Sequence, residues 1–277
     1  MDVDGAVAVI TGGASGIGRS TALELARRGA DVVVGDINDA RIEEVRDEVE
    51  TLGRRYLGVH CDVSKDADVD SLRDQALATM GHVDIMMSNA GVAMLGPAEG
   101  LSMQDWDWIL QINLFGVIRG ARAFIPHMLE RGSGYLVNTA SVAGLYAYAW
   151  DHPTYITAKF GVVGFSEALA LYLRPQGIGV SVLCPSLVAT NIGETSRFGG
   201  VDDPMKWLGG MPSGLDEAMD VALVGPMVAD AIRDDRYLIL TEPDEILPRV
   251  KERGASIGAW IDSYGKTLRE PPNLYRS

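Results

Sequence analysis

A glycine-rich turn near the start of the chain limits its possible folds more than any other feature. The turn, residues 11–18, reads TGGASGIG and follows an apolar run at residues 7–10 that is typical of a buried parallel strand. A helical pattern at residues 19–28 comes next and ends at Gly29. Glycines let the backbone approach a pyrophosphate closely, and the first amides of the following helix point at that anion. The turn therefore predicts a dinucleotide site; the alternative is a glycine-rich connection without a ligand.

An aspartate lies where the ribose of such a dinucleotide would bind. Residues 31–36 form a second apolar run, which completes a βαβ unit of about 30 residues. Asp36 ends this run, 18 residues after Gly18. A carboxylate at this point accepts hydrogen bonds from both ribose hydroxyls and repels a 2′-phosphate, which favours NAD over NADP. The alternative is a solvated aspartate at the end of a strand.

Apolar runs and helical patterns alternate along the rest of the chain. This alternation predicts one α/β domain spanning residues 1–277, with a mainly parallel sheet covered by helices on both faces. Further strands are expected at 54–60, 83–88, 135–139, 179–184 and 237–240, and helices at 40–52, 66–80, 104–131 with a bend at Pro126, 155–173 ended by Pro175, and 216–234.

Two segments interrupt the alternation. Residues 187–215 contain six glycines and two prolines, and a loop of this length in a compact domain predicts a lid over a functional site; the alternative is a disordered stretch. Residues 245–277, after the last expected strand, predict a surface arm.

Composition excludes several classes of function. The net charge of −14 and the pI near 4.7 argue against binding to nucleic acid or to an anionic membrane. No apolar run approaches the roughly 18 residues of a membrane span, and the N-terminus lacks the basic start of a signal peptide, so a cytoplasmic protein is expected. Two cysteines, Cys61 and Cys184, and four scattered histidines predict neither a disulfide scaffold nor a metal site.

A second group of residues has the composition of a catalytic site. Tyr155 and Lys159 are four residues apart and share one face of the helix expected after Pro153. The ammonium group and the helix N-terminus are both expected to lower the pKa of the tyrosine, which would make it a general acid/base. Ser141 follows an expected strand, and Asn113 interrupts a helical pattern. The alternatives are an ordinary surface pair for Tyr155 and Lys159, and an asparagine that bonds to the backbone at a helix irregularity.

Taken together, these motifs resemble the short-chain dehydrogenase/reductase (SDR) family. The resemblance implies a Rossmann-type, doubly wound, seven-stranded parallel sheet with strand order 3-2-1-4-5-6-7, and a homotetramer or dimer formed through the helices at 104–131 and 155–173. Two positions depart from the family pattern, Ser88 in place of asparagine and Ser186 in place of glycine. The matching residues run through nearly the whole chain: 11–18, Asp36, 61–63, 89–91, Asn113, Ser141, Tyr155, Lys159, Pro185 and Thr190.

The resemblance also implies roles for single residues. In a tetrad of Asn113, Ser141, Tyr155 and Lys159, the tyrosine is the acid/base and the serine steadies the substrate oxygen. The lysine lowers the tyrosine pKa and holds the nicotinamide ribose, and the asparagine holds a water for proton relay. The implied cofactor-binding residues are Gly12, Ser15, Gly16, Ile17, Gly18, Asp36, Ile37, Asp62, Val63, Asn89, Ala90, Gly91, Tyr155, Lys159, Pro185, Val188 and Thr190.

The segments that would surround a substrate are apolar, which predicts a bulky, hydrophobic substrate. Together with the resemblance, this predicts an NAD-dependent oxidoreductase acting on a secondary alcohol or ketone of aromatic, terpenoid or steroid-like character. An alternative for the aromatic residues is packing at subunit contacts, and an alternative for the protein is a catalytically silent NAD(H)-sensing binding protein of the same fold. The expected substrate-lining residues are Met94, Leu145, Tyr148, Trp150, Ser186 and Trp207.

Overall fold

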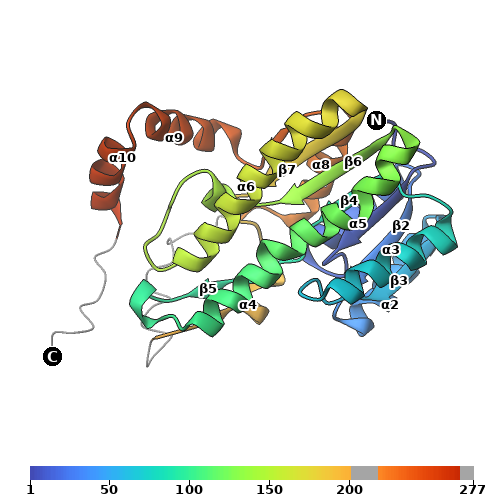
Figure 1. The fold of residues 1–277 in the computed structure, drawn as a ribbon, viewed down its shortest axis with the longest axis horizontal. Coiled ribbons are helices and arrows are strands. Elements are labelled where there is room, and N and C mark those ends of the chain that lie inside the picture. The colour runs from blue at the N-terminus through green and yellow to red at the C-terminus, as the bar shows by residue number, and fades with distance from the viewer. Residues whose placement is uncertain (201–217, 269–277) are drawn as a thin grey trace.

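A seven-stranded, all-parallel sheet forms the centre of the protein (Figure 1). The computed structural model describes residues 1–200 and 218–268. The sheet order is β3-β2-β1-β4-β6-β7-β9, which is 3-2-1-4-5-6-7 when these seven strands are counted along the chain, so the predicted fold is confirmed. The strands are β1 (Val7–Thr11), β2 (Asp31–Asp36), β3 (Tyr56–His60), β4 (Ile85–Ser88), β6 (Gly134–Thr139), β7 (Ile178–Cys184) and β9 (Leu238–Leu240).

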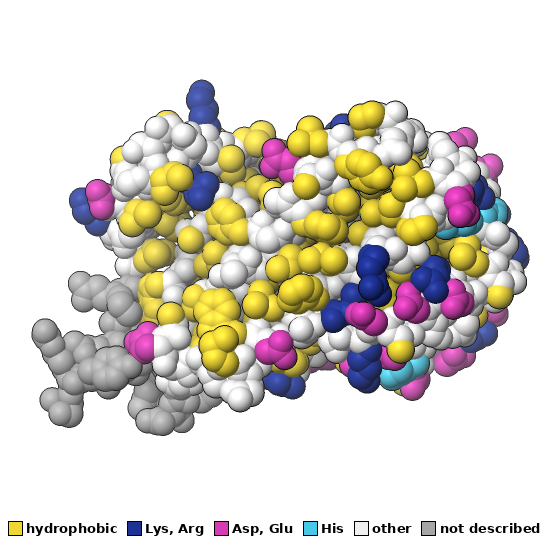
Figure 2. Space-filling model, in the orientation of Figure 1, with side chains coloured by type: hydrophobic (Ala, Val, Ile, Leu, Met, Phe, Trp, Pro, Cys, Tyr) yellow, Lys and Arg dark blue, Asp and Glu magenta, His cyan; other side chains and the backbone are white. Residues whose placement is uncertain are grey.

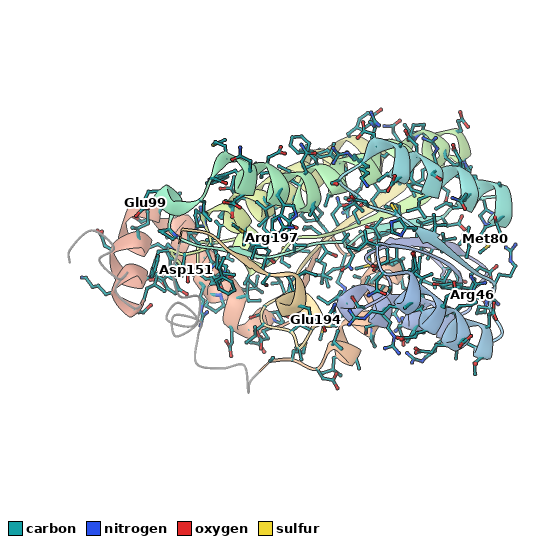
Figure 3. All side chains as sticks on the ribbon, turned by 90° about the horizontal axis from the view of Figure 1, so that it is seen from below. Arg46, Met80, Glu99, Asp151, Glu194 and Arg197 are labelled. Carbon is teal, nitrogen blue, oxygen red and sulfur yellow. The ribbon has the colours of Figure 1, made fainter. Side chains whose placement is uncertain are left out.

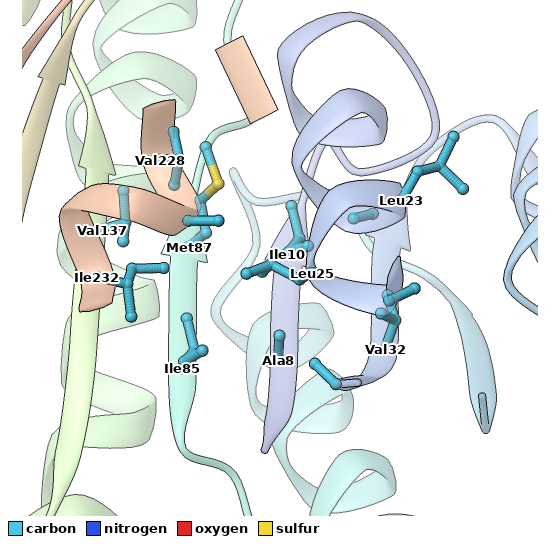
Figure 4. Packing of buried hydrophobic residues seen from close by; sticks show 14 of the residues in the cluster. Ala8, Ile10, Leu23, Leu25, Val32, Ile85, Met87, Val137, Val228 and Ile232 are labelled. Atoms are coloured by element: carbon cyan, nitrogen blue, oxygen red, sulfur yellow. The ribbon is translucent and has the colours of Figure 1, made fainter. Parts of the chain in front are cut away.

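Helices cover both faces of this sheet in a three-layer arrangement (Figure 1). Alternate residues of β1 divide between two apolar clusters, because successive strand side chains point to opposite faces. The helices are α1 (Gly16–Arg27), α2 (Asp39–Thr51), α3 (Asp66–Met80), α4 (Met103–Asn113), α5 (Phe115–Arg131), α6 (Pro153–Leu173), α8 (Val224–Arg233), α9 (Pro243–Ala255) and α10 (Ile257–Tyr264). Ala8 and Ile10 pack in one cluster with α1, α2 and α8 (Figure 4). Val7 and Val9 pack in the other cluster with α3, α5 and α6.

The single bent helix predicted over 104–131 is wrong, because the structure has two helices, α4 and α5, that meet at Leu114. Pro126 lies inside α5 and not at the discontinuity. The guanidinium group of Arg119 donates to the backbone oxygen of Gln111 at 3.0 Å and to its side-chain oxygen at 2.6 Å. These hydrogen bonds stabilise the last turn of α4 where the helix is interrupted.

The C-terminal region also differs from the prediction of a surface arm. Residues 243–264 form α9 and α10, and the buried Trp260 packs on Tyr146 with ring centroids 5.7 Å apart. Tyr264 stacks on Trp260 at 4.5 Å. Aromatic packing therefore docks this helix pair onto the loop that follows Ser141, while residues 269–277 lie outside the described part of the chain.

Two smaller differences lie near the expected lid. The strands β5 (Met94–Leu95) and β8 (Arg197–Phe198) form a short parallel pair that the sequence pattern did not predict. The helix expected over 216–234 begins only at Val224, after a 3-10 turn at Val221–Leu223 whose Ala222 amide donates to Asp220 at 2.9 Å. Residues 201–215 of the expected lid lie outside the described residues.

Candidate functional site

The glycine turn joins β1 to α1 at the carboxyl edge of the sheet. Gly12 has a φ of +61°, and a β-carbon there would lie 2.7 Å from the α-carbon of Ala90. A β-carbon on Gly18 would overlap the backbone oxygen of Gly12. Ser15 precedes α1 without capping it through its side chain, and the first turn of α1 has no acidic residue. The turn can therefore present the backbone amides of Gly16 and its neighbours to an anion.

Asp36 lies at the end of β2, beside the glycine turn. Its carboxylate accepts hydrogen bonds from the amide of Ala14 at 3.1 Å and from the amide of Asn38 at 3.0 Å. The next residue, Ile37, is 63% exposed. A carboxylate has lone pairs beyond those used in two hydrogen bonds, so Asp36 can also accept from ribose hydroxyls.

Asp62 and Val63 follow β3 on the same edge. Burial acts to raise the pKa of Asp62, but hydrogen bonds from Ser64 and the charge of Lys65 outweigh it, so the pKa is lowered and the carboxylate is ionised. The side chain of Val63 is buried. These two residues extend the edge that begins at Asp36.

An ion pair connects this side of the edge to the segment after β7. The Nη2 atom of Arg41 in α2 lies 3.0 Å from Oε2 of Glu194, in the 3-10 turn Asn191–Thr195. Thr190 precedes this turn and accepts a hydrogen bond from the amide of Ile192 at 3.5 Å. The pair therefore ties the segment containing Thr190 to α2.

Asn89 holds the centre of the edge together. Its Nδ2 atom donates to the backbone oxygen of Gly12 at 3.1 Å, and its Oδ1 atom accepts from the hydroxyl of Thr139 at 3.2 Å. Its amide donates to the hydroxyl of Thr11 at 3.1 Å. One side chain thus connects β1, β4 and β6, and it fixes the position of Ala90 and Gly91, which follow it.

The structure brings Ser141, Tyr155 and Lys159 together. Tyr155 lies in the first turn of α6, and Nζ of Lys159 is 5.5 Å from the centre of its ring. The Nζ atom donates to the backbone oxygen of Thr139 at 3.0 Å. The Ser141 hydroxyl accepts from the amide of Ala143 at 3.1 Å and hydrogen-bonds towards Tyr155.

Burial reverses the expected pKa shift of the tyrosine. Desolvation raises the pKa of Tyr155 to about 12, although the hydrogen bond with Ser141 acts to lower it. Desolvation also lowers the pKa of Lys159 to about 8. The prediction of a lowered tyrosine pKa considered neighbouring charges, whereas the loss of water around the phenolate is the larger effect here. The tyrosine is therefore protonated at neutral pH.

Asn113 lies at the junction of α4 and α5 and is fully buried. Its Oδ1 atom accepts from the amide of Val92 and its Nδ2 atom donates to the oxygen of the same residue, both at 2.8 Å. A β-carbon on Gly91 would lie 3.4 Å from Oδ1 of Asn113 and 3.7 Å from Nζ of Lys159. The asparagine side chain thus fixes the backbone next to Lys159. This agrees with the alternative given for Asn113, an asparagine that bonds to the backbone at a helix irregularity.

The segment after β7 completes the edge. The backbone oxygen of Pro185 accepts from the amide of Val142 at 3.0 Å, and the amide of Ser186 donates to the hydroxyl of Thr241 at 2.9 Å. Val188 is buried and bridges to Met219. Ser186, where the family pattern has glycine, is therefore anchored by a buried threonine that follows β9.

The expected substrate-lining residues occupy different surroundings. Met94 is buried with Leu101 and Ile109 in an apolar cluster against which Tyr155 packs. Leu145 and Tyr148 instead pack against the cluster of Tyr146 and Trp260, and burial raises the pKa of Tyr148. Trp150 is partly buried, and Trp207 lies outside the described residues.

Sequence reasoning did not identify several residues that position this site. Thr11 and Thr139 orient Asn89, and Thr139 also holds Lys159. Both threonines end strands of the sheet, and that position is the signal that could have identified them. A buried pair, Asp151 and His152, lies just before α6 and was also missed.

The buried lysine predicts a pH-dependent effect on stability. Because the pKa of Lys159 is about 8 in the folded protein against 10.5 for the ordinary side chain, the unfolded chain binds more protons here between these values, and stability rises with pH across this window. Lys159→Met removes this effect, so we expect the variant to be more stable at pH 7, by about 1–3 kcal/mol. The difference should shrink between pH 8 and pH 10.5.

Urea unfolding across this pH range measures the effect, with Lys251→Met as the control because that side chain is exposed on α9. A variant that is less stable than the wild type at pH 7 would show that burial of the ammonium group carries no net cost.

Comparisons with known proteins agree with this arrangement. The family profile described as short chain dehydrogenase matches residues 6–198. D-threitol dehydrogenase from Mycolicibacterium smegmatis is 39% identical over 76% of this chain and 80% of its own. 3beta-hydroxysteroid dehydrogenase 2 from Eggerthella lenta is 34% identical over 79% of this chain and 86% of its own. The crystal structure of an SDR protein from Burkholderia phymatum in complex with NAD has a TM-score of 0.87, at 32% identity over 99% of this chain and 100% of its own. The chain therefore belongs to the short-chain dehydrogenase/reductase family of oxidoreductases.

Proposed function

We propose that the protein transfers hydride between a nicotinamide dinucleotide, NAD in preference to NADP, and a hydrophobic secondary alcohol or ketone. The observation that carries the proposal is the grouping of Tyr155 with Ser141 and Lys159, whose Nζ atom lies near Gly91, on the edge that also contains the glycine turn. A group that exchanges protons and a site for an anionic dinucleotide are thus adjacent.

The chain's residues fit a dinucleotide. The backbone around Gly12 and Gly18 is packed too closely for a side chain at either position, which leaves the amides of the turn open to a pyrophosphate. Asp36 can accept from the adenosine ribose hydroxyls, and its charge supports the preference for NAD. Lys159 would hold the nicotinamide ribose. When bound, the dinucleotide supplies the acceptor or donor of a hydride.

Proton transfer is assigned to Tyr155. In the reducing direction, its hydroxyl donates a proton to the substrate carbonyl oxygen as that carbon gains a hydride, and the ketone becomes an alcohol. In the oxidising direction, the phenolate accepts the hydroxyl proton as the carbon–hydrogen bond breaks. Ser141 holds the reacting oxygen, and Lys159 stabilises the phenolate by its charge. The raised pKa of Tyr155, about 12, keeps its hydroxyl protonated, and so available as a donor, at neutral pH.

The apolar surroundings of Tyr155 support a hydrophobic substrate. Met94, Leu101 and Ile109 form a buried apolar cluster that packs against the tyrosine. The His152 ring lies 6.5 Å from the Tyr155 ring and 5.5 Å from the Tyr148 ring. A ligand in contact with Tyr155 would therefore meet aliphatic and aromatic side chains.

We further propose that the protein assembles with copies of itself and works in the cytoplasm. Figure 2 shows hydrophobic side chains in a broad band over α4, α5 and α6, where Phe115 is 43%, Leu171 77% and Tyr172 57% exposed. By length and composition alone α6 could cross a membrane, but it packs on the sheet and on α4. A homotetramer or dimer through this band would cover the apolar side chains. The two buried, free cysteines suit a reducing compartment.

Replacement of the proposed acid/base tests the reaction. We expect Tyr155→Phe to lower kcat at least about 1,000-fold in both directions while NADH still binds, because only the proton-exchanging hydroxyl is removed. Absorbance of NADH measures turnover, and NADH fluorescence measures binding. Tyr237→Phe is the control, because its buried hydroxyl has no hydrogen-bond partner among the described residues. A wild type that binds NADH but turns over no alcohol or ketone would favour a binding protein instead.

Removal of one charge tests the choice of cofactor. Asp36→Asn keeps an acceptor for the amide of Ala14 but removes the repulsion of a 2′-phosphate. We expect the ratio of kcat/KM for NAD to that for NADP to fall at least about tenfold. Asp39→Asn, at an exposed carboxylate three residues later, should leave the ratio unchanged. An unchanged ratio in Asp36→Asn would refute the assigned role.

A charge placed in the apolar band tests self-association. We expect sedimentation equilibrium to give a multiple of 29.7 kDa, and Leu171→Arg to lower this mass because it buries a charge at the contact. Ile261→Arg is the matched control on α10, where the side chain is 63% exposed. A wild-type mass of one chain contradicts the proposal.

A further inference from the structure

A buried pair of ionisable side chains lies next to Tyr155 and has no part in the mechanism above. The Nδ1 atom of His152 is 2.6 Å from Oδ1 of Asp151, and the two side chains are 9% and 5% exposed. His152 precedes the first turn of α6, three residues before Tyr155. Figure 3 labels Asp151 at the same end of the molecule as Glu99 and Arg197.

The local fold does not require these two side chains. His152 occupies the N-cap position of α6, but its side chain makes no capping hydrogen bond. Serine, threonine, asparagine or aspartate would cap the helix better, and burial of polar groups costs free energy. Among the described residues, the Asp151 carboxylate bonds only to His152. A function outside helix capping would explain why the pair is buried here.

The position of the imidazole ring points to the substrate. The ring lies near two tyrosines, 5.5 Å from the ring centre of Tyr148 and 6.5 Å from that of Tyr155. The backbone oxygen of Asp151 also accepts from the amide of Gly96 at 2.8 Å, which fixes the pair to the segment that follows Met94. The imidazole is thus held beside the proposed proton donor and next to its apolar wall.

The aspartate determines what the imidazole can bind. A carboxylate at Nδ1 keeps the hydrogen on that nitrogen, so in the neutral ring Nε2 is a hydrogen-bond acceptor. The contact with the Asp151 carboxylate also fixes the orientation of the ring. An acceptor at this place suits a hydroxyl group, and the short distance to Tyr155 requires that hydroxyl to lie close to the reacting carbon.

We propose that His152, oriented by Asp151, is a specificity-determining residue whose Nε2 atom accepts a hydrogen bond from a second hydroxyl of the substrate, one or two carbons from the reacting carbon. The inference rests on the proposed function and refines its substrate class. The preferred substrate is a hydrophobic secondary alcohol that carries a neighbouring hydroxyl, or the corresponding hydroxyketone. Hydrophobic contacts then hold one side of the substrate and the imidazole holds the other.

Matched substrates test the proposal. Oxidation of 1-phenylpropane-1,2-diol and of 1-phenylpropan-1-ol is compared in the wild type, in His152→Phe and in Asp151→Asn. We expect the wild type to prefer the diol at least about tenfold in kcat/KM, as a buried hydrogen bond allows. His152→Phe should remove this preference, because kcat/KM for the diol falls by a larger factor than kcat/KM for the mono-alcohol. His82→Phe is the control, because His82 pairs with Asp84 at 3.0 Å near the amino end of β4.

Asp151→Asn keeps the shape of the pair and allows the other tautomer of His152, so it too should reduce the preference, and it carries the test if His152→Phe does not fold. Equal rates of the wild type on both alcohols would overturn the role of His152 and leave the proposed function intact. Equal losses on both alcohols in the two variants would overturn it in favour of a structural pair. A wild type that binds NADH but turns over neither the alcohols nor their ketones would instead refute the proposed function, and this inference with it.

Discussion

The close approach of the glycine turn to the segment after β4 is the constraint on which the rest of the site depends. Gly18 packs against the backbone oxygen of Gly12, and the same oxygen accepts from Asn89. Because β1 and β4 are neighbours from which the chain winds in opposite directions, their carboxyl ends open a crevice between them. Any side chain at Gly12 or Gly18 would push this crevice apart and disturb the hydrogen bond between Asn89 and Thr139, the residue whose backbone oxygen holds Lys159.

Burial sets the chemistry of the site as much as sequence neighbours do. Lys159 and Tyr155 are both withdrawn from water, and each is shifted towards its neutral form. At neutral pH the tyrosine stays protonated, whereas the lysine, with a pKa of about 8, still carries its charge. The charge of the pair therefore lies on the lysine alone, and an anionic ligand bound beside it would stabilise that charge.

Local patterns predicted the parts of the structure that local physics determines. The glycine spacing, the apolar runs of β1 and β2 and the four-residue separation of Tyr155 and Lys159 each reflect one or two neighbouring elements. The alternation of strands and helices predicted a parallel sheet, but its strand order came from the family resemblance. The break at Leu114 escaped prediction because Asn113 bonds to Val92, 21 residues earlier. The raised tyrosine pKa escaped because desolvation depends on the whole packed domain.

The same distinction explains the C-terminal helices. Pro248 and Gly254 lie inside α9, so its local sequence does not favour a helix, and contacts of Ile246 and Trp260 with the domain supply the missing stabilisation. The two-residue strands β5 and β8 are too short for any periodicity. Their pairing joins segments about 100 residues apart in the sequence, so a local sequence pattern cannot predict it.

The edge-to-face packing of Trp260 on Tyr146 has a consequence for how the substrate site of this protein can change in evolution. The proposed reacting groups belong to β6 and α6, in the middle of the chain, whereas the loop that leads to Tyr148 is supported by residues that follow the last strand. Insertions, deletions or exchanges beyond β9 can therefore reshape one wall of the site and leave Tyr155 and Lys159 where they are. In this architecture the support of one proposed wall of the site is encoded apart from the residues proposed to react.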